Sequence, residues 1–127
     1  MPVVAQDKVL NGQRVLVAED QYLIAEDMRR AVVALGGEVL GPVGQVAAAA
    51  EMLERDRPDL ALLDINLHGE TIYDVAEQLR AAKVPMIFAT GYGAPDIKPG
   101  FTDAVRLEKP VTAEALAAAA RSLGVAS

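Results

Sequence analysis

The sequence predicts an α/β fold in which helices cover both faces of a parallel sheet. Short apolar runs, each about as long as one strand, alternate with segments that have the apolar spacing of a helix. Strands that alternate with helices form parallel sheets, because each helix carries the chain back to the same edge. The length of 127 residues suits one domain with a full hydrophobic core. We therefore expect five strands in one sheet and no second domain.

Five segments have the composition of strands. Residues 60–65, LALLDI, are apolar almost throughout, which indicates a strand that is buried on both faces. Residues 38–43, EVLGPV, contain Gly41 and Pro42, and a proline removes a donor from the sheet, so this strand is expected at an edge. The expected strands span residues 14–18, 38–43, 60–65, 86–90 and 104–108.

Helical spacing follows four of these strands. After the first strand, Met28, Val32 and Leu35 fall on one face, and Gly36 ends the pattern. Thr112 has a side chain suited to the N-cap of the last helix. Residues 66–70, NLHGE, are expected to form a turn. The later helices are expected over residues 46–56, 72–82 and 112–124.

Composition excludes several classes of function. The net charge of −6 and the pI near 4.7 argue against direct binding of nucleic acid, which needs clustered basic residues. Cysteine is absent, so disulfides and thiolate metal sites are excluded. No apolar run reaches the length of a membrane span, and the first residues lack the pattern of a signal peptide. We expect a cytoplasmic protein without membrane insertion, with a leader at residues 1–13 and a core at 14–123.

Polar residues stand at the ends of four expected strands. Glu19 and Asp20 follow the first strand, Asp64 and Thr90 end the third and fourth, and Lys109 follows the fifth. Parallel sheets bind ligands outside the carboxyl ends of their strands, so these side chains are expected to converge. Each aspartate alone could be a helix cap. Three clustered carboxylates, however, repel by about 1 kcal/mol per pair in water and about 4 at an effective dielectric near 20.

This acidic cluster predicts a divalent cation. Oxygen ligands without a competing thiolate suit Mg²⁺, or Mn²⁺, better than Zn²⁺. The cation would keep Asp64 ionised and screen an incoming phosphoryl donor, so that Asp64 could act as a nucleophile. Thr90 and Lys109 would then provide a hydrogen-bond donor and a counter-charge for the phosphoryl oxygens.

The motifs VLVAED, LALLDINL, FAT and EKP, in this order and spacing, resemble the receiver domain of two-component response regulators. The resemblance runs from about Arg14 to Leu123. It implies a flavodoxin-like (CheY-like) doubly wound sheet with strand order 2-1-3-4-5. It also implies that Asp64 accepts a phosphoryl group from a sensor histidine kinase or a histidine phosphotransfer protein.

The same resemblance implies roles for the residues around Asp64. Lys109 would pair with the phosphoryl group, and the peptide bond between Lys109 and Pro110 would be cis. His68, the only histidine, is expected to be a solvated turn residue and not a phosphorelay residue. The implied Mg²⁺ ligands are Glu19, Asp20, Asp64 and the backbone carbonyl of Asn66.

One position departs from the common receiver pattern. Arg106 stands three residues before the lysine, where receivers carry a switch aromatic. Together with FATGY at residues 88–92, this resembles the FATGUY subfamily, whose fourth helix is short or replaced by a loop. Residues 91–101 are accordingly expected to be irregular and to sample several conformations before phosphorylation; alternatively, they form a shortened connection without a signalling role. The expected switch or partner surface comprises Gly91, Tyr92, Arg106 and Pro110. Tyr92 either moves over the site or packs on the surface.

The leading hypothesis is a single-domain response regulator that signals through protein contacts and catalyses only its own phosphorylation and dephosphorylation. A phosphate sink and a receiver fragment of a hybrid kinase are alternatives. An adaptor that works without phosphorylation usually lacks an acid or the lysine. An aspartyl-phosphate phosphohydrolase usually has a second acid two residues after the nucleophile, where Asn66 stands.

Overall fold

Five parallel strands form the central sheet of the computed structural model, which describes residues 8–91, 97–101 and 104–125. The strand order is β2-β1-β3-β6-β7, and all neighbouring strands are parallel. This is the order 2-1-3-4-5 of the five expected strands, so the predicted fold class is confirmed. The edge position expected for residues 38–43 is also confirmed. The strands are β1 (Arg14–Ala18), β2 (Glu38–Val43), β3 (Leu60–Asp64), β6 (Met86–Thr90) and β7 (Val105–Glu108).

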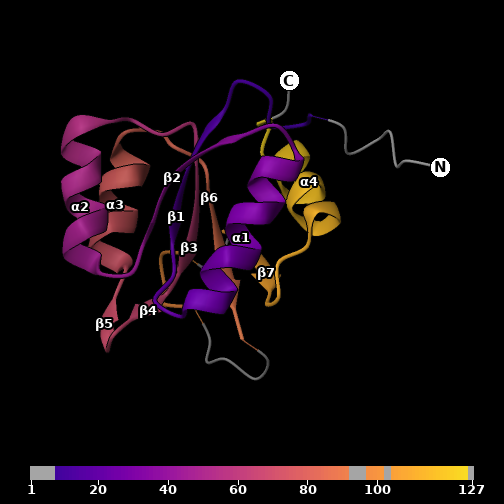
Figure 1. Cartoon of the computed structure of the whole chain (residues 1–127). Coiled ribbons are helices and arrows are strands. Elements are labelled where there is room, and N and C mark those ends of the chain that lie inside the picture. Colours follow the sequence, from indigo (N-terminus) through magenta and orange to yellow (C-terminus); the bar gives the residue numbers. More distant parts are fainter. Residues whose placement is uncertain (1–7, 92–96, 102–103, 126–127) are drawn as a thin grey trace.

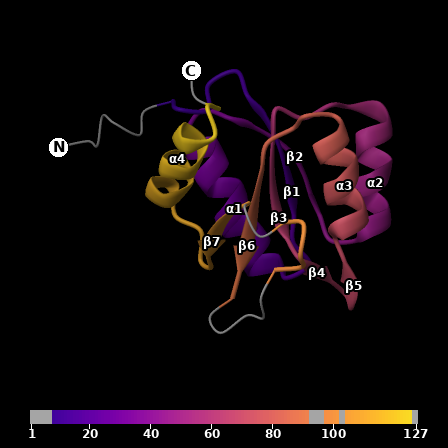
Figure 2. The same cartoon turned by 180° about the vertical axis from the view of Figure 1, so that it is seen from behind.

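Helices cover both faces of the sheet in the described part of the chain. α1 and α4 lie on one face, and α2 and α3 lie on the other (Figures 1 and 2). Alternate residues of β1 explain this arrangement, because Val15 and Val17 belong to the core under α1 and α4, whereas Leu16 belongs to the core under α2 and α3. Thr112 accepts a hydrogen bond from Ala115 N at 3.1 Å and caps α4 as predicted. The helices are α1 (Tyr22–Ala34), α2 (Val46–Arg55), α3 (Tyr73–Ala81) and α4 (Ala113–Ser122).

The core extends beyond the predicted boundaries of 14–123. Val9 and Leu10 are buried against α1, and Leu10 N donates a hydrogen bond to Leu35 O at 2.9 Å. Val125 is buried at the other end of the chain. None of the helices in the described residues has the length and hydropathy of a membrane span.

Residues 66–71 form a β-hairpin that was expected only as a turn. β4 (Asn66–Leu67) pairs antiparallel with β5 (Glu70–Thr71), next to the end of β3. The two residues between them, His68 and Gly69, both have positive φ angles, of 51° and 86°. This backbone matches a type I′ turn, which closes two-residue hairpins.

In the connection between β6 and β7, the described residues 91, 97–101 and 104 form no helix. This agrees with the irregular structure that we expected for residues 91–101. The described end of the connection is packed, because Ile97 and Phe101 are both buried. The Phe101 ring lies 5.3 Å from the Tyr73 ring and 6.0 Å from the Phe88 ring, centroid to centroid. The expected exchange between conformations stays a prediction, and these contacts anchor residues 97–101 on α3 and β6.

Candidate functional site

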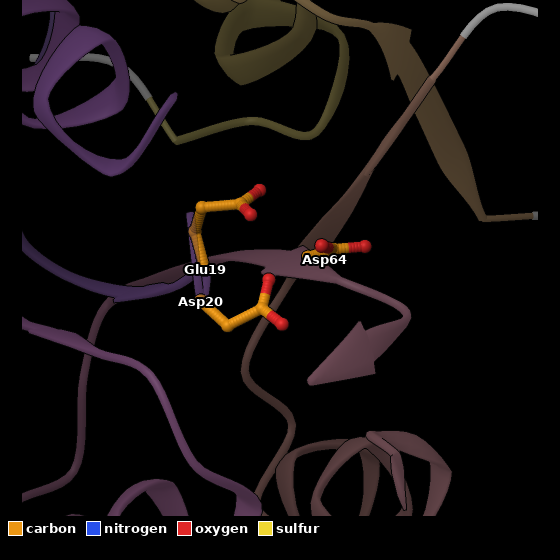
Figure 3. Close-up of side chains that lie close together, drawn as sticks. All are labelled: Glu19, Asp20 and Asp64. Carbon is orange, nitrogen blue, oxygen red and sulfur yellow. The ribbon is translucent and has the colours of Figure 1, made fainter. Parts of the chain in front are cut away.

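The carboxyl edge of the sheet brings together the acids that the sequence singled out. Glu19 and Asp20 follow β1, and Asp64 is the last residue of β3. One oxygen from each of the three side chains lies within 4.8 Å of the others (Figure 3). The parallel register of β1 and β3 causes this meeting, because Ala18 pairs with Leu63 and both strands end at the same level.

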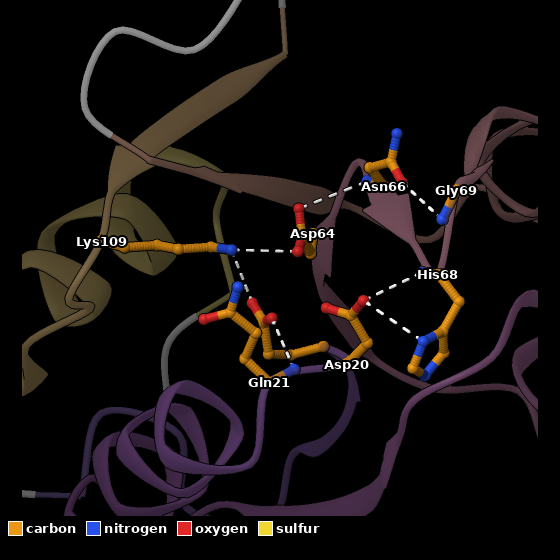
Figure 4. A network of polar contacts seen from close by, with 8 residues as sticks. Asp20, Gln21, Asp64, Asn66, His68, Gly69 and Lys109 are labelled. Atoms are coloured by element: carbon orange, nitrogen blue, oxygen red, sulfur yellow. Dashed lines mark hydrogen bonds and ion pairs between the residues drawn. The ribbon is translucent and has the colours of Figure 1, made fainter.

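Lys109 joins two of the three acids. Its Nζ lies 2.7 Å from Glu19 Oε1. The same Nζ lies 3.0 Å from Asp64 Oδ2 (Figure 4). Its backbone N–H donates to Thr90 O at 2.7 Å, which fixes the end of β7 beside β6. The peptide bond between Lys109 and Pro110 is cis, as expected from the resemblance. Burial by itself would lower the pKa of Lys109, but the carboxylates of Glu19 and Asp64 outweigh this effect and raise it.

Glu19 is the most deeply buried acid of the cluster, with a fully covered side chain. Oε2 accepts a hydrogen bond from Gln21 N at 3.0 Å. Oε1 is paired with the Lys109 ammonium at 2.7 Å. Burial raises the pKa of Glu19, against the opposing influence of Lys109. A buried carboxylate that already pairs with a cation is an oxygen ligand of the kind that a hard metal ion prefers.

Asp20 is held from the hairpin. Its Oδ2 accepts a hydrogen bond from His68 N at 2.9 Å, and this bond is the main reason that the pKa of Asp20 is lowered. The His68 imidazole lies further away, with Nδ1 3.8 Å from the same oxygen. Asp20 is therefore ionised at neutral pH.

The three acids fit a hard divalent cation. Glu19, Asp20 and Asp64 offer only oxygen atoms, which Mg²⁺ and Mn²⁺ prefer. Asn66, the fourth expected ligand, lies next to them: its N–H donates to Asp64 Oδ1 at 3.3 Å, and its side-chain oxygen accepts from Gly69 N at 2.9 Å. The role of the Asn66 carbonyl stays a prediction.

Thr90 lies at the end of β6 and is buried. Arg106 Nε donates to its Oγ1 at 3.5 Å, a long hydrogen bond. Arg106 is exposed, so the position of the usual switch aromatic carries no buried side chain here. Gly91 and Pro110 are exposed as well, whereas Tyr92 lies outside the described residues. The signalling role of this surface stays a prediction.

Sequence reasoning missed the His68 backbone as part of this site. The available signal was the His-Gly pair between Leu67 and Glu70, because glycine in a two-residue connection favours a hairpin. The pairing of Gln21 N with Glu19 Oε2 was missed too. Both contacts are made by backbone N–H groups, so the spacing of apolar residues does not predict them.

Comparison with known proteins assigns the family. Residues 15–121 match the response regulator receiver domain. The chain belongs to this receiver domain family. The receiver domain is similar to the solution structure of SdrG from Sphingomonas melonis Fr1, with 36% identity and a TM-score of 0.81, over 89% of this chain and 97% of SdrG. It is also similar to the receiver (REC) domain of PhyR from Erythrobacter litoralis, with 25% identity and a TM-score of 0.76, over 87% of this chain and 88% of that one.

Curated relatives include larger regulators. The receiver domain is 30% identical to the sensory transduction protein LytT of Bacillus subtilis over 105 residues, which cover 80% of this chain and 44% of LytT. The chain spans less than half the length of the first curated relatives it matches. The similarity therefore concerns the receiver part of these regulators.

Proposed function

We propose that Asp64 of this receiver domain accepts a phosphoryl group from the phosphohistidine of a sensor histidine kinase or a histidine phosphotransfer protein. The observation that carries the proposal is the meeting of three carboxylates within 4.8 Å, with the Lys109 ammonium 3.0 Å from Asp64. Acids placed this close favour a bound cation, and a cation beside a carboxylate and an ammonium favours an incoming phosphoryl group. The family membership of residues 15–121 supports the same chemistry.

The transfer step is a displacement at phosphorus. An oxygen of Asp64 attacks the phosphorus, an O–P bond forms, and the P–N bond of the phosphohistidine breaks with its electron pair left on the imidazole nitrogen. Lys109 moves from the Asp64 carboxylate to the phosphoryl oxygens and balances their charge. Glu19, Asp20, Asp64 and the carbonyl of Asn66 would hold Mg²⁺, which when bound neutralises negative charge on the transferring group.

Thr90 provides the link to the surface in this proposal. Its Oγ1 accepts a long hydrogen bond from Arg106 Nε at 3.5 Å, and this leaves its O–H free to donate to a phosphoryl oxygen on Asp64. Arg106 in the place of the switch aromatic supports assignment to the FATGUY subfamily. The signal then leaves through protein contacts of the surface that includes Gly91 and Pro110. We expect the receiver domain to act in the cytoplasm and to catalyse only its own phosphorylation and dephosphorylation.

We propose that the start of α1, which follows Glu19 and Asp20 in the chain, contacts the phosphohistidine partner. Tyr22 and Leu23, at the start of α1, are 79% and 75% exposed. We infer the contact from their position next to the acids, and aromatic side chains such as Tyr22 are common in protein interfaces. We expect Leu23→Ser to slow phosphorylation by a cognate kinase while leaving the reaction with acetyl phosphate unchanged, as followed by the rate of phosphoprotein formation. Equal slowing of both reactions would contradict the partner role.

The central test is phosphorylation with acetyl phosphate and Mg²⁺, followed by intact-mass and peptide mass spectrometry. We expect one phosphoryl group per chain, located on Asp64, and none in Asp64→Asn. Asp74→Asn, at an exposed position of α3, is the matched control and should react like the native protein. Phosphorylation of another native side chain in Asp64→Asn, at the native rate, would contradict the assignment. Absence of reaction in the native protein with every phosphodonor would favour an adaptor that works without phosphorylation.

A further inference from the structure

The hairpin after Asp64 is anchored to the domain by buried side chains and a backbone hydrogen bond. Leu67, directly before the turn, and Ile72, directly after β5, are fully buried, and Ile72 N donates to Ile65 O at 2.7 Å. His68 and Gly69 form its turn, both in the left-handed region. Glycine enters this region without cost, and histidine is among the other residues that adopt it most often.

Side chains satisfy both backbone N–H groups of the turn. In a two-residue hairpin these groups are not part of the ladder between the strands. Gly69 N donates to Asn66 Oδ1 at 2.9 Å, within the hairpin. His68 N donates to Asp20 Oδ2, also at 2.9 Å, across a separation of 48 residues in the sequence (Figure 4).

This long-range bond restricts the carboxylate of Asp20. One of its oxygens is directed at the hairpin, while the other lies on the side of Asp64 (Figure 4). An aspartate on a loop otherwise rotates and loses conformational freedom when it binds a cation. The hydrogen bond from His68 N restricts the rotation of the Asp20 carboxylate before a cation binds. It leaves the second oxygen of Asp20 for the site shared with Glu19 and Asp64.

We propose that the hairpin of residues 66–71 is a positioning element of the cation site, and that the backbone N–H of His68 orients Asp20 for a divalent cation. The inference rests on the proposed function of that site. It makes His68 a positioning residue that acts through its backbone, whereas its imidazole has no part in it. Loss of a partner that orients a metal ligand typically lowers metal affinity about tenfold to hundredfold. Because this hairpin is exposed, we expect an effect near the lower value.

Two substitutions at one position separate the backbone from the side chain. His68→Pro removes the N–H and cannot adopt a φ of 51°, because the proline ring fixes φ near −65°. His68→Gly keeps the N–H and favours the left-handed turn, but removes the imidazole. Mg²⁺ binding is measured by calorimetry, since the chain has no tryptophan. We expect the Kd of His68→Pro to rise about tenfold and that of His68→Gly to rise much less.

The rate of phosphorylation by acetyl phosphate as a function of Mg²⁺ concentration gives a second readout. In His68→Pro the Mg²⁺ concentration for half-maximal rate should rise, while the rate at saturating Mg²⁺ should return close to the native value. A defect of the fold would lower the saturating rate as well. Equal loss of affinity in both variants would assign the effect to the imidazole and overturn the inference, as would native affinity in a folded His68→Pro.

A measurement on the native protein covers the case in which His68→Pro does not fold. The His68 amide should be protected from hydrogen exchange, and Asp20→Ala should remove that protection while the amides of β3 remain protected. Exchange of the His68 amide at the rate of an unstructured peptide overturns the inference. Failure of the proposed function is distinct, because the native protein would then not be phosphorylated on Asp64 at any Mg²⁺ concentration.

Discussion

Replacement of Lys109 by methionine should destabilise the metal-free domain, and Mg²⁺ should reverse part of the loss. Methionine is unbranched and keeps much of the side-chain volume, but it leaves Glu19 and Asp64 without their ammonium partner. Glu19 carries the larger penalty, because its side chain is fully covered and water cannot take the place of Lys109.

The distances set the magnitude. At 2.7 Å the attraction between Lys109 and Glu19 is about 1.5 kcal/mol in water and about 6 kcal/mol at an effective dielectric of 20. At 3.0 Å the attraction to Asp64 is about 1.4 and about 5.5 kcal/mol on the same assumptions. The substitution also removes the cost of burying the ammonium, so the net loss is smaller than these sums. Removing one partner of a buried ion pair costs about 3 to 5 kcal/mol, and we expect about 3 kcal/mol here.

The sign of the pH dependence follows from Glu19. Burial already raises its pKa, and loss of Lys109 removes the effect that opposes burial, so the pKa of Glu19 rises further. A raised carboxyl pKa favours the folded state at low pH, where the acid is protonated, and opposes it at high pH. The deficit of Lys109→Met should therefore be larger at pH 8 than at pH 5.

Urea unfolding followed by circular dichroism checks this prediction, with chelator and with Mg²⁺, at both pH values. Lys83→Met is the matched control, because Lys83 is exposed and its loss changes the net charge equally. The free energy of unfolding of Lys83→Met should lie within about 0.5 kcal/mol of the native value. The reasoning is refuted if Lys109→Met is as stable as the native protein in chelator, or if Mg²⁺ widens the difference between them.

Three further outcomes follow from the same contacts. Asp20→Asn removes a charge from the cation site, so calorimetry should show a clearly higher Kd for Mg²⁺; an unchanged Kd would remove the metal-site argument. Phe101→Ala deletes a buried ring packed between Tyr73 and Phe88, so urea unfolding should show a loss of about 3 to 4 kcal/mol, with faster amide exchange at residues 97–101; native stability would mean that this end of the connection is not anchored. Hydrogen bonding to Arg29 lowers the pKa of Glu26 to about 2, so its stabilising effect is complete above the ordinary value of 4.5 and is lost as the pH falls toward 2. The difference in urea midpoint between native protein and Glu26→Gln should shrink from pH 6 to pH 3, and a difference that grows would contradict the pairing.

The parallel α/β architecture was predictable from local patterns in the sequence, whereas the strand order followed from the resemblance to receiver domains. An apolar run such as LALLD predicts a strand that is buried on both faces, and every residue of β3 before Asp64 is buried. Parallel strands joined by helices place all their carboxyl ends on one edge. For this reason the sequence alone predicts the convergence of Glu19, Asp20, Asp64 and Lys109.

The tertiary structure alone decided how these residues pair. The sequence does not show that Lys109 Nζ lies nearer to Glu19 than to Asp64. That difference depends on how the ends of β1, β3 and β7 are placed relative to one another. The sequence also does not place the N–H of His68 on Asp20, a contact between loops 48 residues apart. The burial of Phe101 against Tyr73 is of the same kind, since glycine and proline neighbours mark an irregular segment without showing what covers it. The periodicity of apolar residues indicates which face of a helix or strand is buried. Contacts between loops depend instead on where the sheet places the end of each strand.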